Sequence, residues 1–325
     1  MMTPQSHHLV AALLATTAIA LLPAQAQIAA EVKRPAITGV SHLALYVHDL
    51  DKSRAFYKDF LGFAEAPYVK KNKDGSIHLI WIKINDTQTI ELFEEPKDRV
   101  GNPDRLNHLG LVTDDAEAMR QYLASRGVKV PDQTPLGSTR NKNYFVQDPD
   151  GHNIEMVQYM PDGATMKDKG HSLPETRIST RLPHGGITVR DLDASLKFYR
   201  DILGFREIWR GSSNGKTLSW VHVQVPNGTD FIELMLGEPT PQRIATLHHF
   251  CLEVPDVIKA SETLKARKLP EGCKPPTEMR AGISRKRQIN YYDPDSTRVE
   301  IMEPGTVDGK PAPSSDAPPP RPKAE

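Results

Sequence analysis

The chain carries the same set of four potential metal ligands twice, in the same order. Each set alternates two histidines with two glutamates: His42, Glu91, His108 and Glu155 first, then His184, Glu233, His249 and Glu300. Corresponding residues of the two sets lie between 141 and 145 positions apart. A repeat with so constant a period predicts two structural copies of one domain. Two histidines with two carboxylates are also a common ligand shell for a divalent transition metal.

Other landmarks repeat in the same register. Both copies contain, in order, an aromatic pair, a Leu-Gly-Phe tripeptide and an Asp-Pro-Asp turn that begins seven residues before the last glutamate. These are Phe56-Tyr57, Leu61-Gly62-Phe63 and Asp148-Pro149-Asp150 in the first copy, and Phe198-Tyr199, Leu203-Gly204-Phe205 and Asp293-Pro294-Asp295 in the second. Chance similarity does not keep so many landmarks aligned over the length of a domain.

Length and charge limit the class of protein. The 325 residues suffice for about two domains of roughly 150 residues each. Lys and Arg number 41 together, as do Asp and Glu, so the formal net charge is zero. A nucleic-acid-binding protein usually has a strong basic excess, so we expect no nucleic-acid partner. The balance also gives no sign of electrostatic attachment to a membrane.

Both ends of the chain are predicted to lie outside the fold. Residues 1–26 have the pattern of a signal peptide, with an apolar run from Leu9 to Leu22 and a small-residue cleavage site after Ala26. The run is too short for a comfortable transmembrane helix. We therefore expect an exported protein, periplasmic or extracellular, with no membrane association after signal cleavage. Residues 306–325 are rich in Pro, Ser and Lys, which predicts a disordered tail.

Hydrophobic periodicity predicts an α+β fold. Alternating apolar residues after His42 and His184 indicate strands, and each is followed by a helical pattern that stops at Gly62 or Gly204. Three strand-like runs follow each helix, and the pattern then restarts at the second histidine of each set. Each copy is thus two β-α-β-β-β units, forming curved mixed sheets around a trough. We expect the domains at residues 36–160 and 178–305, with a linker at 161–177.

This arrangement would bring the predicted ligands together. The four histidines each open the first strand of a unit, and the four glutamates each lie in the last strand of a unit. First and last strands of two units can converge when the units form one curved sheet. Two groupings stay open: the ligands can join within each domain, or cross over so that His42 and Glu91 join His249 and Glu300.

The motifs resemble the vicinal oxygen chelate (VOC) superfamily, which includes glyoxalase I, extradiol dioxygenases and antibiotic-binding proteins of the bleomycin-resistance type. His42-x-x-Leu45-x-Val47, continued by Ser53-x-x-Phe56-Tyr57 and Leu61-Gly62-Phe63, is close to a glyoxalase I signature. His248-His249-Phe250-Cys251 is similar to part of the second signature, whose Gly-rich lead-in is absent. The resemblance covers about residues 36–160 and 178–305 and implies two tandem VOC domains.

The resemblance implies a divalent metal, Ni²⁺, Zn²⁺, Co²⁺, Mn²⁺ or Fe²⁺, held by the eight repeated residues, and a small-molecule substrate chelated through adjacent oxygens. Enzymes similar to glyoxalase I also use a glutamate to shuttle a proton, a role open to Glu91, Glu155, Glu233 and Glu300. The preferred interpretation is an exported lyase or isomerase that transfers a proton next to a carbonyl. Export disfavours a glutathione-derived substrate, because glutathione is mainly a cytosolic thiol. The sequence specifies neither the substrate nor the oligomeric state.

Two alternatives remain. An Fe²⁺-dependent ring-cleaving dioxygenase would use two His and one Glu. The resemblance to that class also calls for another His upstream of the last strand, which neither copy has between Pro131 and Tyr144 or between Pro275 and Tyr292. A ligand-binding protein without turnover is the second alternative, although such relatives usually lack the metal ligands.

The remaining distinctive residues are expected to have structural roles. His48, His78, His152, His171, His222 and His248 are predicted to be unremarkable, Trp81 and Trp220 to be core aromatics at matching positions, and Cys251 and Cys273 to be unpaired. The basic loop from Arg280 to Arg287 would suit an acidic substrate, but a solvated loop is the simpler interpretation.

Overall fold

The computed structural model describes Met1 and residues 32–321. Apart from Met1, the predicted signal peptide lies outside the described residues. The first half contains β1 Ile37–Val47, α1 Leu50–Arg54, η1 Ala55–Phe60, β2 Ala64–Lys71, β3 Ile77–Lys83, β4 Thr89–Glu94, η2 Lys97–Arg99, β5 Leu106–Thr113, α2 Ala116–Ser125, β6 Lys142–Gln147, β7 Asn153–Gln158 and α3 Ala164–Lys167. The second contains β8 Arg181–Val189, α4 Leu192–Leu196, η3 Lys197–Ile202, β9 Arg206–Gly211, β10 Trp220–Gln224, β11 Phe231–Leu236, α5 Pro241–Leu247, β12 His249–Glu253, α6 Val257–Ala266, β13 Arg280–Ala281, β14 Lys286–Tyr292 and β15 Arg298–Thr306.

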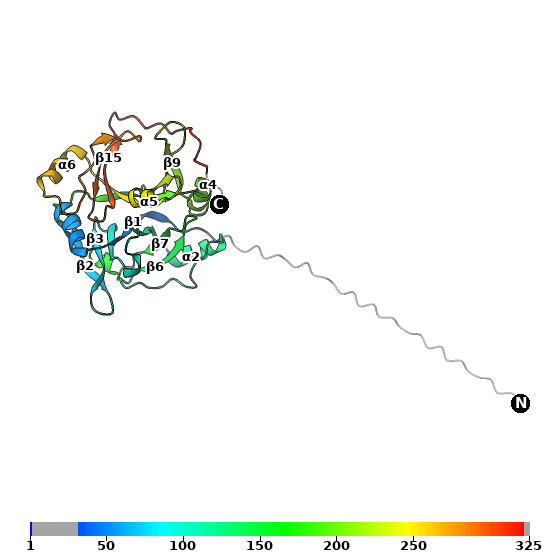
Figure 1. The fold of residues 1–325 in the computed structure, drawn as a ribbon. Helices are drawn as coiled ribbons and strands as arrows, with labels where there is room; N and C mark the ends of the chain where they lie inside the picture. The colour runs from blue at the N-terminus through cyan, green and yellow to red at the C-terminus, as the bar shows by residue number, and fades with distance from the viewer. Residues whose placement is uncertain (2–31, 322–325) are drawn as a thin grey trace. The chain divides into compact units, whose positions relative to one another are not determined.

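The strands form two curved mixed sheets, one for each half of the chain (Figure 1). The first sheet has the order β2-β3-β4-β1-β5-β7-β6, and the second has the order β13-β14-β15-β12-β8-β11-β10-β9. In each sheet the first strand of the domain pairs in parallel with the last strand of its own unit and antiparallel with the first strand of the next unit. This topology confirms the predicted α+β fold of paired units.

The first helical segment of each domain ends at the glycine that the sequence predicts. Aspartates Asp49, Asp115, Asp191 and Asp256 cap the N-termini of α1, α2, α4 and α6 by accepting hydrogen bonds from backbone N–H groups of the first turn. Gly62 and Gly204 follow η1 and η3 with φ of +81° and +76°, a left-handed conformation that glycine adopts without strain. The sequence did not predict that α1 and α4 each continue as a π-helical turn.

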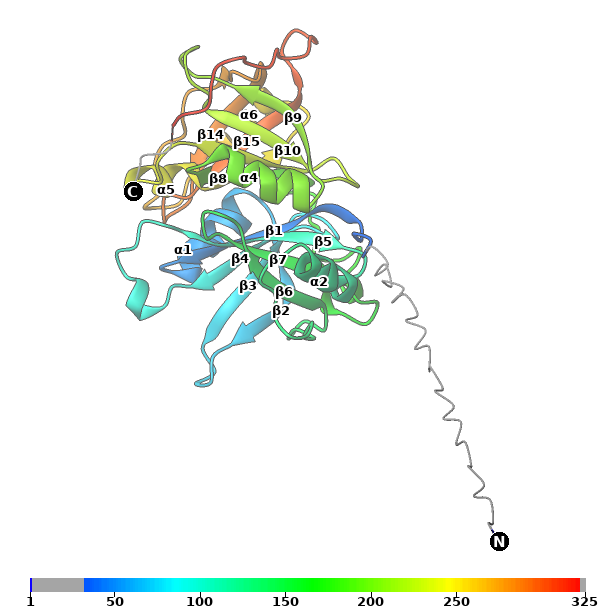
Figure 2. The same cartoon turned by 90° about the vertical axis from the view of Figure 1, so that its right-hand side faces the viewer.

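The first helical segment of each half contacts the other half. Tyr57 of η1 donates a hydrogen bond to Asp293 at 2.9 Å, and Tyr199 of η3 donates one to Asp148 at 2.9 Å. Phe60 also contacts Tyr291 of the second sheet. The first helix of each domain therefore packs on the second unit of the other domain, and Figure 2 shows α4 above α2 in this arrangement. One hydrophobic core consequently spans both halves.

Two segments differ from the sequence-based expectation. Between α2 and β6 only an isolated bridge from Leu136 to Lys142 forms in place of a strand. Pro131 and Pro135 lie in this segment, and proline cannot donate a ladder hydrogen bond. The tail expected to be disordered is described to Arg321 and is attached to the second sheet. Trp209, Ser315 and Leu218 contribute to that attachment through hydrogen bonds that link the tail to β9 and to the chain before β10.

No helix within residues 32–321 is long and apolar enough to cross a membrane.

Candidate metal centres

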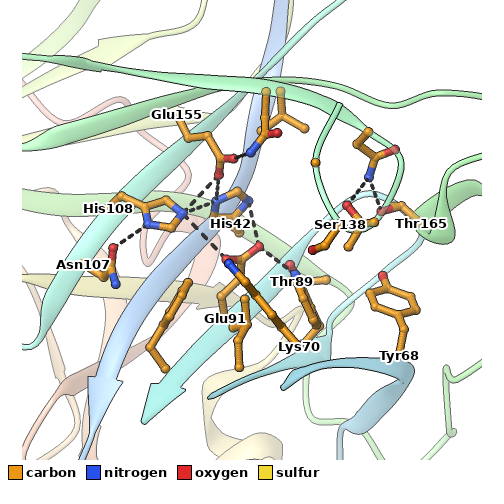
Figure 3. Close-up of a pocket in the computed structure, with 18 of the residues that line it drawn as sticks. His42, Tyr68, Lys70, Thr89, Glu91, Asn107, His108, Ser138, Glu155 and Thr165 are labelled. Atoms are coloured by element: carbon orange, nitrogen blue, oxygen red, sulfur yellow. Dashed lines mark hydrogen bonds and ion pairs between the residues drawn. The ribbon is translucent and has the colours of Figure 1, made fainter. Parts of the chain in front are cut away.

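The first centre consists of His42, Glu91, His108 and Glu155, and four adjacent strands supply it. His42 lies on β1, Glu91 on β4, His108 on β5 and Glu155 on β7, and β4-β1-β5-β7 is the middle of the first sheet. All four residues are at least 92% buried. Their side chains point to the same face, as Figure 3 shows. The ligands of this domain therefore group together, and the alternative crossed grouping is wrong.

Three ligand atoms of the first centre form a tight triangle. His42 Nε2 lies 2.9 Å from His108 Nε2 and 2.9 Å from Glu155 Oε2, and His108 Nε2 lies 3.1 Å from Glu155 Oε2. Two ligands bound to one metal at about 2.0–2.1 Å and at right angles lie about 2.9 Å apart. The triangle thus fits one face of an octahedral metal site, and these residues form one of two three-residue groups able to hold a metal in the described chain.

Glu91 stands outside this triangle. Its carboxylate oxygens lie 3.7 Å from His42 Nδ1 and 3.7 Å from His108 Nε2. The indole N–H of Trp81, directly opposite on β3, donates a hydrogen bond of 2.7 Å to Glu91 Oε1. Glu91 is therefore held beside the metal position by an uncharged donor, while one of its oxygens is left for other partners.

Hydrogen bonds set the charge and orientation of the triangle residues. Burial raises the pKa of Glu155, but hydrogen bonds with His108 and His42 outweigh it and hold that pKa far below its usual range. Burial alone would lower the pKa of His42. The adjacent carboxylates of Glu91 and Glu155 outweigh burial, so the pKa of His42 is raised above its usual value. Asn107 Oδ1 accepts from His108 Nδ1 at 2.8 Å, which directs the lone pair of Nε2 into the centre. The carboxylate Glu155 also accepts from Asn143.

The first centre opens into a cavity of about 340 Å³, the first trough. Phe93 and Phe145 approach the His108 ring edge-on at 5.9 and 5.0 Å between centroids. Tyr68 and Thr165 line the cavity further out (Figure 3). The trough combines an aromatic wall with hydroxyl and amide groups, which suits a small molecule with several polar atoms.

The second centre consists of His184, Glu233, His249 and Glu300 on β8, β11, β12 and β15, the corresponding strands of the second sheet. His184 Nε2 lies 3.2 Å from Glu300 Oε2, and His249 Nε2 lies 3.2 Å from Glu233 Oε2 and 3.8 Å from Glu300 Oε2. His184, His249 and Glu300 form the other group able to hold a metal.

Buried ring nitrogens of the second centre lack hydrogen-bond partners. Both nitrogens of His184 and Nε2 of His249 are in this state. A neutral imidazole has one nitrogen that can only accept, and burying that nitrogen without a partner is costly, so the Nε2 positions of the two rings fit a bound metal. Burial lowers the pKa of His184, which keeps the ring neutral and able to donate its lone pair. Burial opposes ionisation of Glu233, but the adjacent side chains of His222 and His249 hold its pKa well below the usual range.

A glycine makes room for one histidine ring in each centre. A Cβ on Gly110 would lie 2.4 Å from His42 Cε1, and a Cβ on Gly186 would lie 1.9 Å from His249 Cε1. Gly185, by contrast, faces the other domain, where its Cβ would meet Leu43. Of the Gly185-Gly186 pair, only Gly186 therefore serves the second centre, and it accommodates a ligand ring.

Sequence reasoning missed His222. Its Nε2 lies 2.9 Å from Glu233 Oε1, and His222 is opposite Glu233 in the ladder just as Trp81 is opposite Glu91. The prediction that Trp81 matches Trp220 is therefore wrong, because Trp220 is opposite Met235. The match between Trp81 and His222 becomes visible when the two copies are aligned backward from Glu91 and Glu233, with one extra residue allowed in the second copy.

The sequence and the fold are similar to known proteins. Residues 39–156 and 181–301 match the family model of the Glyoxalase/Bleomycin resistance protein/Dioxygenase superfamily. The uncharacterised protein YaeR of Escherichia coli is 32% identical over 126 residues, which are 37% of this chain and 95% of that protein. The metallothiol transferase FosB of Staphylococcus epidermidis is 27% identical over 135 residues, 41% of this chain and 87% of that protein.

Two solved structures share the tandem fold. The Mn(II)-bound glyoxalase from Novosphingobium aromaticivorans superposes with a TM-score of 0.62 at 18% identity, covering 88% of this chain and 89% of that one. The 2,3-dioxygenase LapB from Pseudomonas sp. KL28 superposes with a TM-score of 0.62 at 18% identity, covering 86% of this chain and 97% of that one.

Proposed function

Because the chain belongs to the Glyoxalase/Bleomycin resistance protein/Dioxygenase superfamily, we propose that it is a metal-dependent enzyme that transfers a proton next to a carbonyl of a small molecule. One observation carries the proposal. The triangle of His42, His108 and Glu155 has edges of 2.9, 2.9 and 3.1 Å and leaves Glu91 beside it as a separate carboxylate. A metal site with an adjacent free base is the arrangement that this chemistry needs.

The roles of the four residues then differ. His42, His108 and Glu155 would hold a divalent ion of the Ni²⁺, Zn²⁺, Co²⁺, Mn²⁺ or Fe²⁺ type. When bound, the ion supplies Lewis-acid stabilisation to negative charge that develops on a substrate oxygen. Asn107 and Asn143 orient the ligand side chains through the hydrogen bonds described above.

Glu91 is the proposed base. Its carboxylate takes a proton from the hydroxyl-bearing carbon next to the substrate carbonyl, and the C–H electron pair moves toward the carbonyl oxygen. The protonated Glu91, which exchanges its proton with solvent, then returns a proton to the former carbonyl carbon. The α-hydroxyl proton passes to the former carbonyl oxygen, and the hydroxyl-bearing carbon becomes the new carbonyl. The step is an isomerisation, so no oxidant or second substrate is consumed. Trp81 keeps Glu91 aimed at the trough through its hydrogen bond.

Ring cleavage is the second candidate. Each three-residue group in the described chain contains two His and one Glu, the composition of the facial triad used by non-haem Fe²⁺ oxygenases. His222 beside Glu233 also places an imidazole at the edge of the second centre. Oxygen consumption with catechol after anaerobic loading with Fe²⁺ tests this candidate, and a protein that holds iron but consumes no oxygen excludes catechol cleavage.

Metal content and variants test the preferred function. Elemental analysis of the protein purified without chelator should give up to two metal atoms per chain, one for each group. Glu155→Gln should lose the metal atom of the first centre. Glu91→Gln should retain that metal atom and slow proton transfer about 10²–10⁴-fold. Proton transfer is measured as deuterium uptake from D₂O by a panel of α-hydroxy carbonyl compounds and α-keto hemithioacetals. Loss of metal in Glu91→Gln, or unchanged exchange, would contradict the assigned role.

The same proposal places the enzyme outside the cytoplasm. The support is the signal-peptide pattern of residues 1–26, with cleavage after Ala26.

A further inference from the structure

The two centres differ in the group beside their second histidine. In the first centre this neighbour is Asn107, an amide whose oxygen accepts from His108. In the second it is Arg298, whose Nη2 lies 2.6 Å from His249 Nδ1. Arg298 is two residues before Glu300 on β15, so both side chains lie on the concave face. A permanent cation therefore stands next to the second centre.

This cation is incompletely paired. The nearest carboxylate oxygen, Oε2 of Glu233, lies 3.9 Å from Nη2, and Nε of Arg298 is buried without a hydrogen-bond partner. The guanidinium can only donate hydrogen bonds. His249 Nδ1 is a poor partner for it, because the same nitrogen lies 2.6 Å from the carbonyl oxygen of Leu247, which can only accept. Arg298 thus has donors left over inside the protein.

The acidic groups nearby are engaged elsewhere. Glu233 interacts with His222 at 2.9 Å and with His249 at 3.2 Å, and Glu300 interacts with His184 at 3.2 Å. Neither carboxylate is free to neutralise Arg298 fully. An oxyanion entering from outside would supply the missing acceptor.

The surrounding cavity, the second trough, has a volume of about 300 Å³ and is suited to such a ligand. Arg280, on the hairpin that borders the trough, forms no ion pair among the described residues and adds a second guanidinium. Trp209 and Trp220 line the same cavity, and Trp209 is fixed by a hydrogen bond to Pro313 of the tail. The basic loop from Arg280 to Arg287, expected from the sequence to be solvated, thus forms part of the cavity wall.

The first trough lacks this arrangement. Asn153 corresponds to Arg298 in the strand register, and it lines a different cavity, at the boundary between the two halves. The cation of the first trough is Lys70, which is exposed on strand β2. Lys70 therefore provides a matched control for the arginines of the second trough.

We propose that the second trough recognises an acidic small molecule, with its carboxylate or phosphoryl-type oxyanion on Arg298 and Arg280 and its apolar part against Trp209 and Trp220. Guanidinium groups bind such planar or tetrahedral oxyanions through paired charge-assisted hydrogen bonds. The inference builds on the proposed function, because it names the substrate class of the second trough.

Calorimetric titration of the full chain with benzoate, phenylphosphonate and the neutral isostere benzamide tests the inference. At least one anion should bind the wild type more tightly than benzamide, and Arg298→Gln should weaken that binding about tenfold or more. Arg280→Gln should weaken it to a smaller extent, and Lys70→Gln should leave it unchanged. Arg280 is exposed, so its variant keeps the test valid if Arg298→Gln fails to fold. Equal binding of anion and benzamide, or loss of anion binding in Lys70→Gln alone, would overturn the inference.

The same titration after chelator treatment separates this inference from the proposed function. Anion binding that survives metal removal and depends on Arg298 supports the inference even if no turnover is ever found. Anion binding that requires metal and is unaffected by Arg298→Gln overturns the inference, while the proposed metal-dependent function stands.

Discussion

The substitution Gly110→Ala tests whether His42 must stay where it is for the first centre to bind metal. The added Cβ would lie 2.4 Å from His42 Cε1 and 2.6 Å from Nδ1, whereas ordinary van der Waals contact begins near 3.4 Å. The imidazole would have to retreat by about 1 Å. A ligand moved that far no longer completes the triangle with His108 and Glu155, and changes of this kind around metal sites typically cost 10–100-fold in affinity.

Stability and metal binding should respond differently to this change. Replacing glycine by alanine in a strand restricts the unfolded chain, which by itself stabilises a protein by about 0.4–1 kcal/mol. Overpacking opposes this by about 1–3 kcal/mol. We therefore expect a small net loss of unfolding free energy beside a large loss of metal affinity.

The assay is a competition titration with a chelating dye that counts tight metal sites in each variant. Gly110→Ala should lose one tight site of the two, and Gly186→Ala should lose the other. Gly305→Ala is the matched control, because its Cβ would meet nothing within 4 Å. A Gly110→Ala protein that folds and holds both metals with wild-type affinity would refute the reasoning.

Three further predictions concern stability and processing. The Lys83 ammonium is buried 2.9 Å from the Asp168 carboxylate, so Lys83→Met should cost about 3–5 kcal/mol in urea unfolding. Adding Asp168→Leu to Lys83→Met should recover part of that loss. An unchanged unfolding free energy in Lys83→Met alone would contradict a stabilising buried ion pair. Burial raises the pKa of Asp293 to about 7, so between about pH 4 and pH 7 the folded state retains a proton that the unfolded chain releases. Unfolding free energy should therefore fall as pH rises through this window, by on the order of a few kcal/mol, and Asp293→Asn should remove that component; parallel wild-type and variant curves would disprove it. Mass spectrometry of the periplasmic fraction of a Gram-negative host should find a chain beginning after Ala26, whereas an intact cytoplasmic chain would exclude export.

Local features of the sequence were sufficient to predict most of the strands, the first helix of each unit and the residues that gather in the two centres. The aspartate caps, the glycines at the ends of the helices and the alternating strands act within a few residues of themselves, so their consequences are visible in the sequence. The repeated His and Glu positions predicted which strands meet, because first and last strands of a unit pair in parallel.

Contacts between distant residues were decided only by the tertiary structure. Three features join residues 47 or more positions apart. They are the grouping of the ligands within each sheet, the contacts of Tyr57 and Tyr199 across the interface, and the contact of Arg298 with His249. The register that places His222 opposite Glu233 depends on a single extra residue between the strands. The sequence therefore determined the two sets of ligands, while the pairing of strands within each sheet determined which ligands share a centre and which residues stand beside them. The physical reason is that spacing along the chain restricts local geometry, whereas burial of one shared core selects among several long-range pairings that the same spacing allows.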